Sequence, residues 1–386
     1  MGKFKKSTSL IIALALTLSV SFLTTEKVHA QETTTNSQKK VIVVLKDKTS
    51  TKDKSSKLKE KRKDVKELIN VNSIITELTD NEINDLKKDS TVLSVEEDSK
   101  MFAIQDEITD WGITKVGAEK SWSNYTGSGV DIAVIDTGAN TSHPDLVDAV
   151  VNGVSEVSYT TSYQDDNGHG THCAGIIGAR QNGTGVVGIA PQSSIYAVKA
   201  LDSNGSGYTS DIISGIDWSI GQDVDIISMS LGSSTSSKAL KSACDTANAK
   251  GILVVAAAGN TGSKSATVRS KDTINYPAKY ESVIAVGATD SNNLRAYFSS
   301  TGSELDVVAP GYQIVSDCYT GGTVTMSGTS MATPYVAGDI ALLKQANPTY
   351  TSTQLRKLLQ DTAKDLGPVG TDSLYGHGLI QAPSLV

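Results

Sequence analysis

Three short segments hold side chains that could together break an acyl bond. Asp136 ends the apolar run 131–135 and precedes Thr-Gly, His169 lies between two glycines, and Ser330 follows Ser-Gly-Thr. A serine hydroxyl is a weak nucleophile until a base takes its proton, and that base needs a carboxylate to orient it. The three residues supply one group of each kind, so we predict a catalytic triad of Asp136, His169 and Ser330.

Each residue has a plainer interpretation when it is taken alone. Asp136 could be a turn residue before Gly138, and Ser330 could cap the N-terminus of a helix. His169 and His172 are three residues apart and could hold a metal ion, but they lack the His-Glu-x-x-His spacing and an obvious third ligand. The joint occurrence of the three segments favours catalysis.

A fourth segment offers a group that stabilises negative charge. Asn260 follows the apolar run 254–258 and a glycine. Its side-chain amide could donate a hydrogen bond to an oxyanion, together with the backbone N–H of Ser330. The start of a helix at Ser330 would favour negative charge in the same place. The alternative is an ordinary turn asparagine.

Short apolar strands that alternate with helices must position these residues. From Trp111 onward the pattern predicts an α/β fold, with a mainly parallel sheet covered by helices on both faces. Asp136 then lies at the carboxyl end of a strand, where open α/β sheets place their sites. The predicted strands span 131–135, 194–200, 224–229, 252–258 and 282–286, and the predicted helices span 169–178, 209–220, 237–250, 330–345 and 353–362.

The first hundred residues have a different character. Residues 1–30 combine a basic start, an apolar run and the small-residue ending Val-His-Ala, as a secretory signal peptide does. The apolar run is shorter than the ~20 residues of a membrane anchor. Farther on, predicted strands at 41–45, 74–78 and 91–95 and predicted helices at 54–68 and 80–87 fit a small β-α-β-β-α-β unit. Such a small unit buries little core and needs a partner surface.

Charge limits the classes of partner. Residues 1–104 hold 19 Lys and Arg against 15 Asp and Glu (net +4), whereas residues 105–386 hold 16 against 27 (net −11). The acidic larger part would be repelled by the phosphates of nucleic acid, and it offers oxygen ligands for hard cations.

The three cysteines are Cys173, Cys244 and Cys318, so at least one thiol of a monomer is unpaired. We expect Cys173 and Cys244 to be small buried apolar residues. The sequence leaves a Cys244–Cys318 bridge open.

The motifs Asp-Thr-Gly, His-Gly-Thr-His and Gly-Thr-Ser-Met-Ala, in this order, resemble those of the subtilisin-like (subtilase) serine proteases. The resemblance covers essentially the whole chain and implies a secreted, self-processing serine endopeptidase of broad specificity. It implies a signal peptide at 1–30, an inhibitory and folding-assisting propeptide of ferredoxin-like fold at 31–105, and a catalytic domain at 106–386. Self-cleavage would fall between about Ala103 and Asp106.

The resemblance also assigns substrate contacts. Two segments would flank an extended substrate as added strands, and a third would form walls of the primary specificity pocket. At the base of that pocket many relatives carry Gly where this chain has Asn275, which argues against a preference for large aromatic residues. The stretch between Asn260 and Pro277 is also about four residues longer than in common relatives. The assigned residues are Ser206, Gly207, Tyr208, Ser230, Leu231, Gly232, Ala257, Ala258, Gly259 and Asn275.

Two structural Ca²⁺ sites are implied as well. The loop 180–186, which we expect to interrupt the helix after His169, can aim alternate carbonyls at one ion. Solvated loops are the alternative at both places. The first site would use Asp145, Asn182, the carbonyls of Arg180, Thr184 and Val186, and a residue near Glu107; the second would use the carbonyls of Ala278, Tyr280 and Val283, near Glu304 and Asp306.

Functions of other classes are less well supported. A non-catalytic binding module would need a broken triad, and an esterase would normally carry its serine in a Gly-x-Ser-x-Gly elbow, which Gly328–Ala332 does not form. A narrow processing protease stays open. The expected partners are protein or peptide substrates and the chain's own propeptide, with no nucleic acid and no membrane after signal removal. We expect an extracellular monomer.

Overall fold

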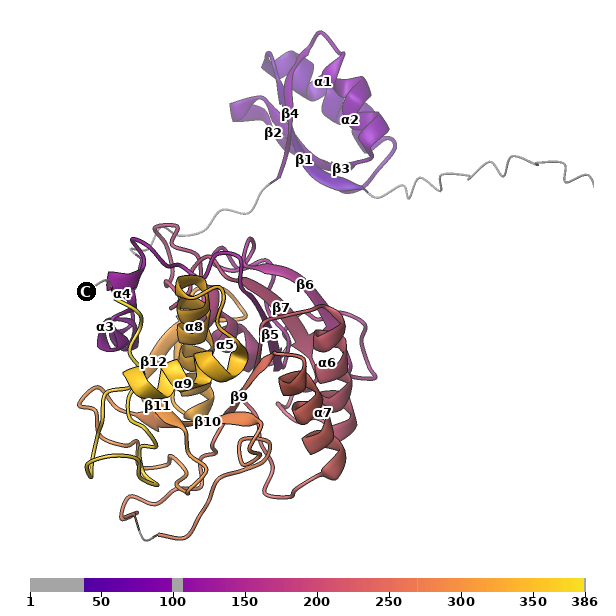
Figure 1. Cartoon of the computed structure of the whole chain (residues 1–386). Coiled ribbons are helices and arrows are strands. Elements are labelled where there is room, and N and C mark those ends of the chain that lie inside the picture. The colour runs from indigo at the N-terminus through magenta and orange to yellow at the C-terminus, as the bar shows by residue number, and fades with distance from the viewer. Residues whose placement is uncertain (1–37, 99–106, 269, 385–386) are drawn as a thin grey trace, which may run out of the picture. The chain divides into compact units, whose positions relative to one another are not determined.

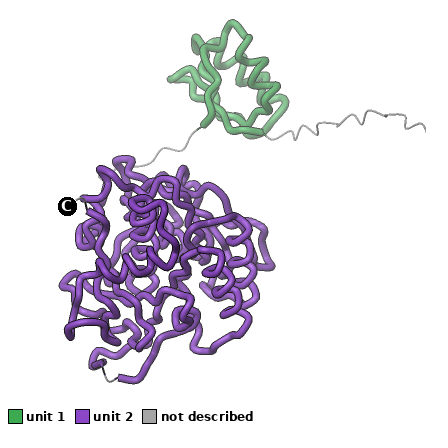
Figure 2. The backbone as a smooth tube through the Cα atoms, in the orientation of Figure 1, with its two compact units in different colours: residues 1–102 green, residues 103–386 purple. Residues whose placement is uncertain are grey.

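The computed structural model describes residues 38–98, 107–268 and 270–384 of the 386-residue chain (Figure 1). These residues form two compact units, within 1–102 and 103–386 (Figure 2). The predicted signal peptide and the predicted cleavage region at 103–106 lie outside the described residues.

The first unit contains an antiparallel sheet with strand order β2-β3-β1-β4. Alternate residues of β1, Val41, Val43 and Leu45, are buried against Ile74 and Leu78, as the two-residue period of a strand requires. The elements are β1 (Lys39–Leu45), α1 (Lys48–Lys59), β2 (Lys66–Leu68), η1 (Ile69–Val71), β3 (Ser73–Leu78), α2 (Asp80–Lys87) and β4 (Val92–Glu97). Their order is the predicted β-α-β-β-α-β.

The predicted helix at 54–68 is wrong at both ends. The α1 helix begins earlier, because the Asp47 side chain accepts a hydrogen bond from the Ser50 N–H (2.8 Å) and caps the helix start. It ends at Lys59, and residues 66–68 form a strand that pairs with β3. Charged residues without a strong apolar stripe gave no signal for this boundary.

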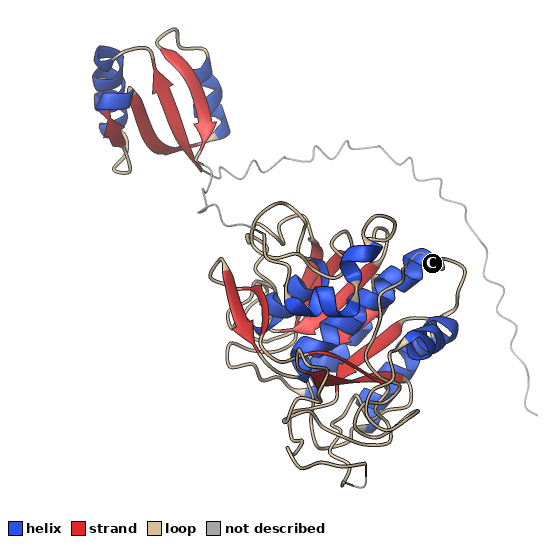
Figure 3. Ribbon diagram, turned by 90° about the vertical axis from the view of Figure 1, so that its left-hand side faces the viewer, coloured by secondary structure: helices blue, strands red, loops and turns tan. Residues whose placement is uncertain are grey.

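The second unit is built on a seven-stranded sheet, order β11-β10-β9-β8-β5-β7-β6, in which every neighbouring pair is parallel. Figure 3 shows its strands between helices. The predicted parallel α/β fold is confirmed. The strands are β5 (Asp131–Asp136), β6 (Val150–Ser155), β7 (Ser194–Lys199), β8 (Ile226–Met229), β9 (Leu253–Ala257), β10 (Val283–Thr289) and β11 (Val307–Pro310), with a separate antiparallel pair, β12 (Ile314–Asp317) and β13 (Thr323–Met326).

Helices cover both faces of this sheet (Figure 1). Within β5, Ile132 and Val134 join the core shared with α5 and α8, whereas Ala133 and Ile135 join the core shared with α6 and α7. Burial on both faces explains why the strand is an unbroken apolar run. The helices are α3 (Trp111–Val116), α4 (Ala118–Ser121), α5 (His169–Gly178), α6 (Thr209–Gly221), α7 (Lys238–Ala249), α8 (Thr329–Ala346) and α9 (Ser352–Thr362).

Four strands of the second unit had no prediction. The edge strand β6 contains Asn152 and Gly153 and is half exposed, and β11 has four residues and ends in Pro310. An exposed edge strand has no continuous apolar run, and a strand of four residues is too short to show a clear pattern even when, like β11, it is buried. The short pair β12–β13 escaped detection for the same reason.

Candidate active site

The topology of the sheet brings two of the predicted residues, Asp136 and Ser230, to one edge. The chain moves from β5 toward β7 and β6 on one side and toward β8 to β11 on the other, so the strand order reverses at β5. Asp136 ends β5, and Ser230 directly follows the neighbouring β8. The carboxyl edge at such a switch point is where open α/β sheets bind ligands.

Asp136 and His169 form a close pair at this edge. The His169 Nδ1 lies 2.7 Å and 2.9 Å from the two carboxylate oxygens of Asp136, and the Thr137 N–H donates to the same carboxylate (2.7 Å). The Asp136 side chain is fully buried, whereas the His169 ring is 26% exposed. Burial of the ring lowers its pKa, but the adjacent Asp136 carboxylate more than offsets this, and the pKa of His169 is raised well above its ordinary value.

A network of hydrogen bonds fixes the loop that carries His169. The Asp165 carboxylate accepts the N–H groups of Asn167 (3.0 Å) and Gly168 (2.9 Å), and the Thr137 hydroxyl accepts the Gly170 N–H (2.9 Å). Gly168 has φ 112°, a conformation that favours glycine. The glycines around His169 therefore serve the turn that places the ring at the start of α5.

His172 does not share a metal ion with His169. Its Nε2 faces the carbonyl oxygens of Ile314 (3.2 Å) and Val324 (3.1 Å), to which it donates, while the His169 Nδ1 faces Asp136. Burial lowers the pKa of His172 to about 4, which keeps the ring neutral. Its role is to tie α5 to the β12–β13 pair.

Ser330 is the second residue of α8, which begins at Thr329 rather than at Ser330. Its hydroxyl donates to the Ser230 carbonyl oxygen (3.2 Å). The Cys173 Sγ lies 4.0 Å from the His169 Nδ1 and 3.6 Å from the Ser330 carbonyl oxygen, so these residues line one small space.

Pro334 explains an unusual contact of Ser330. A helix residue four positions on normally donates its N–H to the Ser330 carbonyl, but proline has no N–H to give. The Ser230 hydroxyl donates to that carbonyl instead (2.7 Å). Ser230 and Ser330 thus exchange two hydrogen bonds, which join the helix start to the segment after β8. The proline in Met-Ala-Thr-Pro was a signal for this contact, and our sequence analysis did not use it.

Asn260 lies beside the start of the same helix. Its side-chain oxygen accepts the Thr329 N–H (2.9 Å) and the Thr329 hydroxyl (3.0 Å), which orients the amide. Asn260 is exposed, and a Cβ atom at Gly328 would lie 3.4 Å from its Nδ2, so the NH₂ group lies beside the turn that precedes α8. A donor and a helix N-terminus therefore adjoin Ser330. Thr329, which our sequence analysis missed, holds the donor in place.

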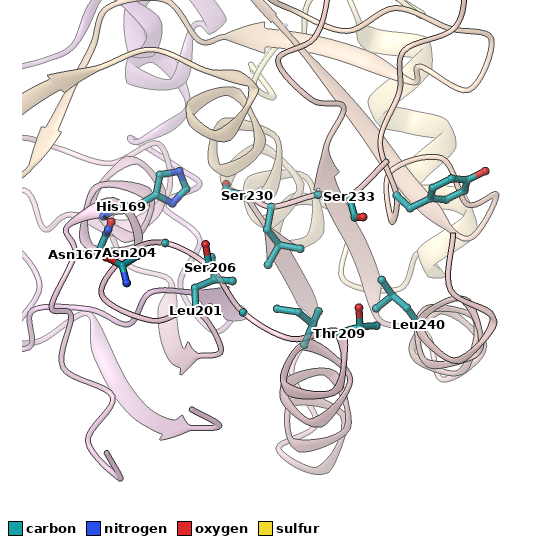
Figure 4. A pocket seen from close by; sticks show the side chains of 15 residues that line it. Asn167, His169, Leu201, Asn204, Ser206, Thr209, Ser230, Ser233 and Leu240 are labelled. Atoms are coloured by element: carbon teal, nitrogen blue, oxygen red, sulfur yellow. Dashed lines mark hydrogen bonds between the residues drawn. The ribbon is translucent and has the colours of Figure 1, made fainter. Parts of the chain in front are cut away.

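A cleft of about 520 Å³ is lined by His169 and Ser230. Figure 4 shows these two residues in the upper part of the view and Thr209 and Leu240, which also line the cleft, in the lower part. Both predicted substrate segments line it, through Ser206, Gly207, Ser230, Leu231 and Gly232. Tyr208, which is 80% exposed, lines an adjacent hollow that shares Ser206 and Gly207.

Known proteins resemble this chain along nearly its whole length. The model of the subtilase family matches residues 127–378. Subtilisin E from Bacillus subtilis (strain 168) is 46% identical over 378 residues, which cover 96% of each chain. The M-protease of Shouchella clausii (strain KSM-K16) is 39% identical over 387 residues, 99% of this chain and 98% of that protein. The chain belongs to the subtilase family of serine endopeptidases.

A further relative is longer. The minor extracellular protease Epr of Bacillus subtilis (strain 168) is 42% identical over 393 residues, and the match covers 97% of this subtilase but 58% of Epr.

In this subtilase, Asn275 lies between Gly259 of the predicted specificity pocket and Gly232 of a predicted substrate-flanking segment. A Cβ atom on Gly259 would lie 2.9 Å from its Nδ2, and one on Gly232 would lie 3.0 Å from its Cβ. The Asn275 N–H donates to the Ala258 carbonyl (2.9 Å), while Ala257 and Ala258 are buried at the end of β9. The predicted pocket residues are therefore adjacent, and the Asn275 side chain takes up room between them.

The loop 180–186 gathers the residues of the first predicted cation site. The buried Asp145 carboxylate accepts the Val186 N–H (2.9 Å) and the Asn182 side-chain amide (3.1 Å), and Glu107 accepts the N–H groups of Asn182 (2.8 Å) and Gly183 (2.9 Å). A Cβ atom on Gly185 would collide with Asp145, so the loop closes on the carboxylate as far as glycine allows. Two carboxylates and an amide around one loop fit a hard cation. The loop follows the end of α5 at Gly178, and no helix resumes within residues 179–193.

The residues of the second predicted cation site do not fit an ion. The Arg356 guanidinium donates to the Val283 carbonyl (3.1 Å) and to the Asp306 carboxylate (2.8 Å). Gln360 donates to the same carboxylate (2.8 Å), and the Tyr280 carbonyl accepts the Val283 N–H (2.9 Å). A side-chain cation already neutralises the group that an ion would need.

All three cysteines are free, so the open Cys244–Cys318 bridge is not formed. Cys173 and Cys244 are fully buried, as predicted. Burial raises the pKa of the Cys173 thiol. Its contact with His169 had no signal in the sequence beyond its place one helical turn after the histidine.

Proposed function

We propose that Asp136, His169 and Ser330 are the catalytic triad of this endopeptidase and that Asn260 completes its oxyanion hole. The observation that carries the proposal is the Asp136–His169 pair at the carboxyl edge of the sheet. His169 lines the cleft, and so does Ser230, which is hydrogen-bonded to Ser330 near the start of α8. An isolated buried Asp–His pair is common, but this pair lies near a serine at the start of a helix, because Cys173 contacts both His169 and Ser330.

In the proposed mechanism, His169 removes the Ser330 proton while the hydroxyl oxygen attacks a peptide carbonyl. Asp136 holds the Nδ1–H tautomer of His169 and stabilises the imidazolium that forms. The Asn260 amide and the Ser330 N–H donate to the oxyanion. His169 then protonates the leaving amine, and water that His169 activates hydrolyses the acyl-enzyme.

The substrate would bind as an extended strand between the segments 206–208 and 230–232, which line the cleft. Main-chain pairing accepts many sequences, so we propose broad specificity. The room that Asn275 takes between Gly232 and Gly259 favours small or polar side chains before the scissile bond. A panel of peptides that differ only at this position tests the preference, with Asn275→Gly as the matched variant that should gain activity on phenylalanine.

We propose that the chain is made with a signal peptide and an inhibitory propeptide and acts outside the cell as a monomer. The relatives that match nearly end to end are named subtilisins, and the β-α-β-β-α-β unit at 39–97 is separate from the catalytic unit. Among the described residues, none of the helices has both the length and the apolar character that a bilayer crossing requires.

The test compares wild type with Ser330→Ala by N-terminal sequencing of secreted protein and by digestion of casein. We expect wild type to begin near residues 104–106 and to fragment casein broadly, while the variant keeps its N-terminal unit and leaves casein intact. Asn260→Ala should reduce kcat by about 10²–10³ with little change in KM. Maturation and digestion by Ser330→Ala at the wild-type rate would end the triad proposal.

We propose one structural Ca²⁺ ion at the loop 180–186, held by Asp145, Asn182, Glu107 and the carbonyls of Arg180, Thr184 and Val186. The ion has no step in the reaction; it would neutralise the carboxylates and stiffen the loop. Chelation should lower the thermal midpoint of wild type but not that of an Asn182→Ala variant, and kcat on a short peptide should change little.

A further inference from the structure

A buried histidine and two buried carboxylates form a cluster that includes no residue lining the cleft. His143 and Asp145 belong to the loop between β5 and β6, and Asp317 is the last residue of β12. Their side chains are 2%, 1% and 0% exposed. One ligand atom from each lies within 4.8 Å of the other two.

The hydrogen bonds of His143 place the lone pair of the neutral ring on Nδ1. The His143 Nε2 lies 2.9 Å from the Gly322 carbonyl oxygen, and because a carbonyl only accepts, Nε2 carries the hydrogen. The Nδ1 atom accepts the Asp145 N–H at 3.3 Å, and a metal ion bound to Nδ1 would take the place of this long hydrogen bond. Metal-binding histidines usually donate their other ring N–H to a carbonyl or carboxylate, as Nε2 does here.

Asp317 has no partner of its own. Neither of its carboxylate oxygens makes a hydrogen bond with the described residues, although the side chain is fully buried. Its Oδ1 lies 3.6 Å from the His143 Nδ1, and the Asp145 Oδ2 lies 4.0 Å from the same nitrogen. Within the described chain, neither carboxylate pairs with a lysine or an arginine. A buried carboxylate without a donor is costly, so this cluster lacks a positive partner.

We propose that His143, Asp145 and Asp317 together bind one divalent transition-metal ion, for which Zn²⁺ is the natural probe. Atoms bound to one such ion at about 2.0–2.2 Å lie roughly 3–4 Å apart, which is the spacing of Nδ1 and the two carboxylates. Two carboxylates and an imidazole suit zinc, manganese or cobalt, whereas Ca²⁺ prefers an all-oxygen set.

Asp145 faces two ways in this arrangement. Its Oδ1 meets the Asn182 amide of the loop 180–186, and its Oδ2 is the oxygen nearest to His143. The carboxylate could therefore bridge the proposed Ca²⁺ and the transition metal. The new ion would join the loop after β5 to the β12–β13 pair, which leads into α8 and Ser330. Its expected effect is on stability and not on the chemical step.

The experiment measures the metal content of the full chain carrying Ser330→Ala, which suppresses self-digestion. The protein is unfolded with a chelator, refolded with excess Ca²⁺ and Zn²⁺, desalted and analysed by mass spectrometry. We expect one zinc per chain that Ca²⁺ does not displace, and a higher thermal midpoint with zinc than without. Replacement by Co²⁺ should give visible d–d absorption typical of mixed nitrogen and oxygen ligation.

The matched variants are Asp317→Asn and Asp339→Asn. Asp339 is also fully buried with both oxygens unpartnered, but it belongs to no such cluster among the described residues. We expect Asp317→Asn to weaken zinc binding at least about 100-fold and Asp339→Asn to leave it unchanged. If Asp317→Asn does not fold, the test uses zinc binding by His143→Gln and the Co²⁺ spectrum of the parent protein instead.

Two outcomes overturn the proposal. The first is that the parent protein binds no zinc and gives no cobalt spectrum. This would mean that a proton on Asp317, rather than a metal ion, neutralises its buried charge. Burial does raise the pKa of Asp317 well above its ordinary value. The second is equal zinc binding by the parent and by Asp317→Asn. Both readouts are independent of proteolytic activity, so they also stand if the triad proposal fails.

Discussion

Two buried carboxylates show how differently this chain uses the same side chain. Asp136 at the end of β5 and Asp339 inside α8 are both fully buried. Asp136 accepts the Thr137 N–H and faces the His169 ring, whereas the oxygens of Asp339 have no hydrogen-bond partner in the described chain. Burial raises the pKa of Asp339 to about 7. Partners, and not burial alone, therefore distinguish a carboxylate that can hold a cationic ring from one that tends to be neutral.

The largest expected effect comes from neutralising the partnered carboxylate. Asp136→Asn keeps the shape of the side chain but removes the charge that holds the His169 tautomer. We expect kcat on a peptide amide to fall by about 10⁴-fold while the protein stays folded. Asp339→Asn is the matched change and should keep wild-type kcat. A loss of less than about 100-fold in Asp136→Asn would contradict the role assigned to the carboxylate.

The same pair sets the pH dependence of activity. His169 must be neutral to accept the Ser330 proton, and the nearby Asp136 carboxylate raises the pKa of the ring. Activity should therefore be lost as pH falls through this raised pKa, about tenfold for each further pH unit. We expect the acid limb of kcat/KM to lie above the ordinary imidazole value of ~6.5. If the acid limb lies at or below that value, burial lowers the pKa of His169 more than the Asp136 carboxylate raises it.

The unpartnered carboxylate should act on stability instead. The pKa of Asp339 is about 7 in the folded state and lower in the unfolded chain, so folding favours the protonated form. Stability is then lost as pH rises from about 4 to about 7, by up to about 4 kcal/mol, and stays low above that. Asp339→Ala should remove this loss and be the more stable protein at pH 8.

Denaturant unfolding at several pH values measures this effect, in the Ser330→Ala background. Asp217→Ala, an exposed aspartate within α6, is the control and should show a much smaller pH-dependent difference. We expect the difference in unfolding free energy between Asp339→Ala and its parent to grow from pH 4 to pH 7. If it does not grow, Asp339 has a partner after all.

The smallest effect concerns the support of the oxyanion donor. Thr329→Val removes the hydroxyl that donates to the Asn260 side-chain oxygen but keeps the Thr329 N–H, which donates to the same atom. We expect kcat to fall by about tenfold with KM nearly unchanged, a smaller loss than the 10²–10³ of removing the donor itself. The conservative Thr329→Ser should restore kcat, and failure to do so would assign the hydroxyl a packing role.

The sequence predicted the parallel sheet because its strands are buried on both faces and are therefore unbroken apolar runs. It also predicted most of the helices. The α5 range was predicted to the residue, since Gly168 marks its start and Gly178 its end. The strand β6 escaped because it lies at an edge, and α1 was misplaced because its charged surface carries little period. The pattern of neighbouring residues in the sequence thus failed where contacts with distant segments decide the structure.

For the site, motifs named the side chains that we propose to be catalytic but not the residues that hold them. Thr329, Thr137 and Asp165 act through hydrogen bonds between segments far apart in the chain, and a single sequence does not show such pairing. Arg356 is a further example. It lies 50 residues after Asp306 and pairs with its carboxylate, and the ligand types from which the second cation site was predicted gave no sign of this competing side-chain cation.

The exchange between Ser230 and Ser330 has a consequence for how this enzyme can be remodelled. The Ser330 carbonyl accepts the Ser230 hydroxyl, and Ser230 is the first residue of the proposed substrate-flanking segment. In the proposed mechanism the Ser330 N–H also donates to the oxyanion, so these hydrogen bonds would keep the scissile bond aligned with that donor. Loops exchanged from Leu231 onward should leave that alignment intact, whereas grafts that replace Ser230 should shift where along a bound peptide the cut is made.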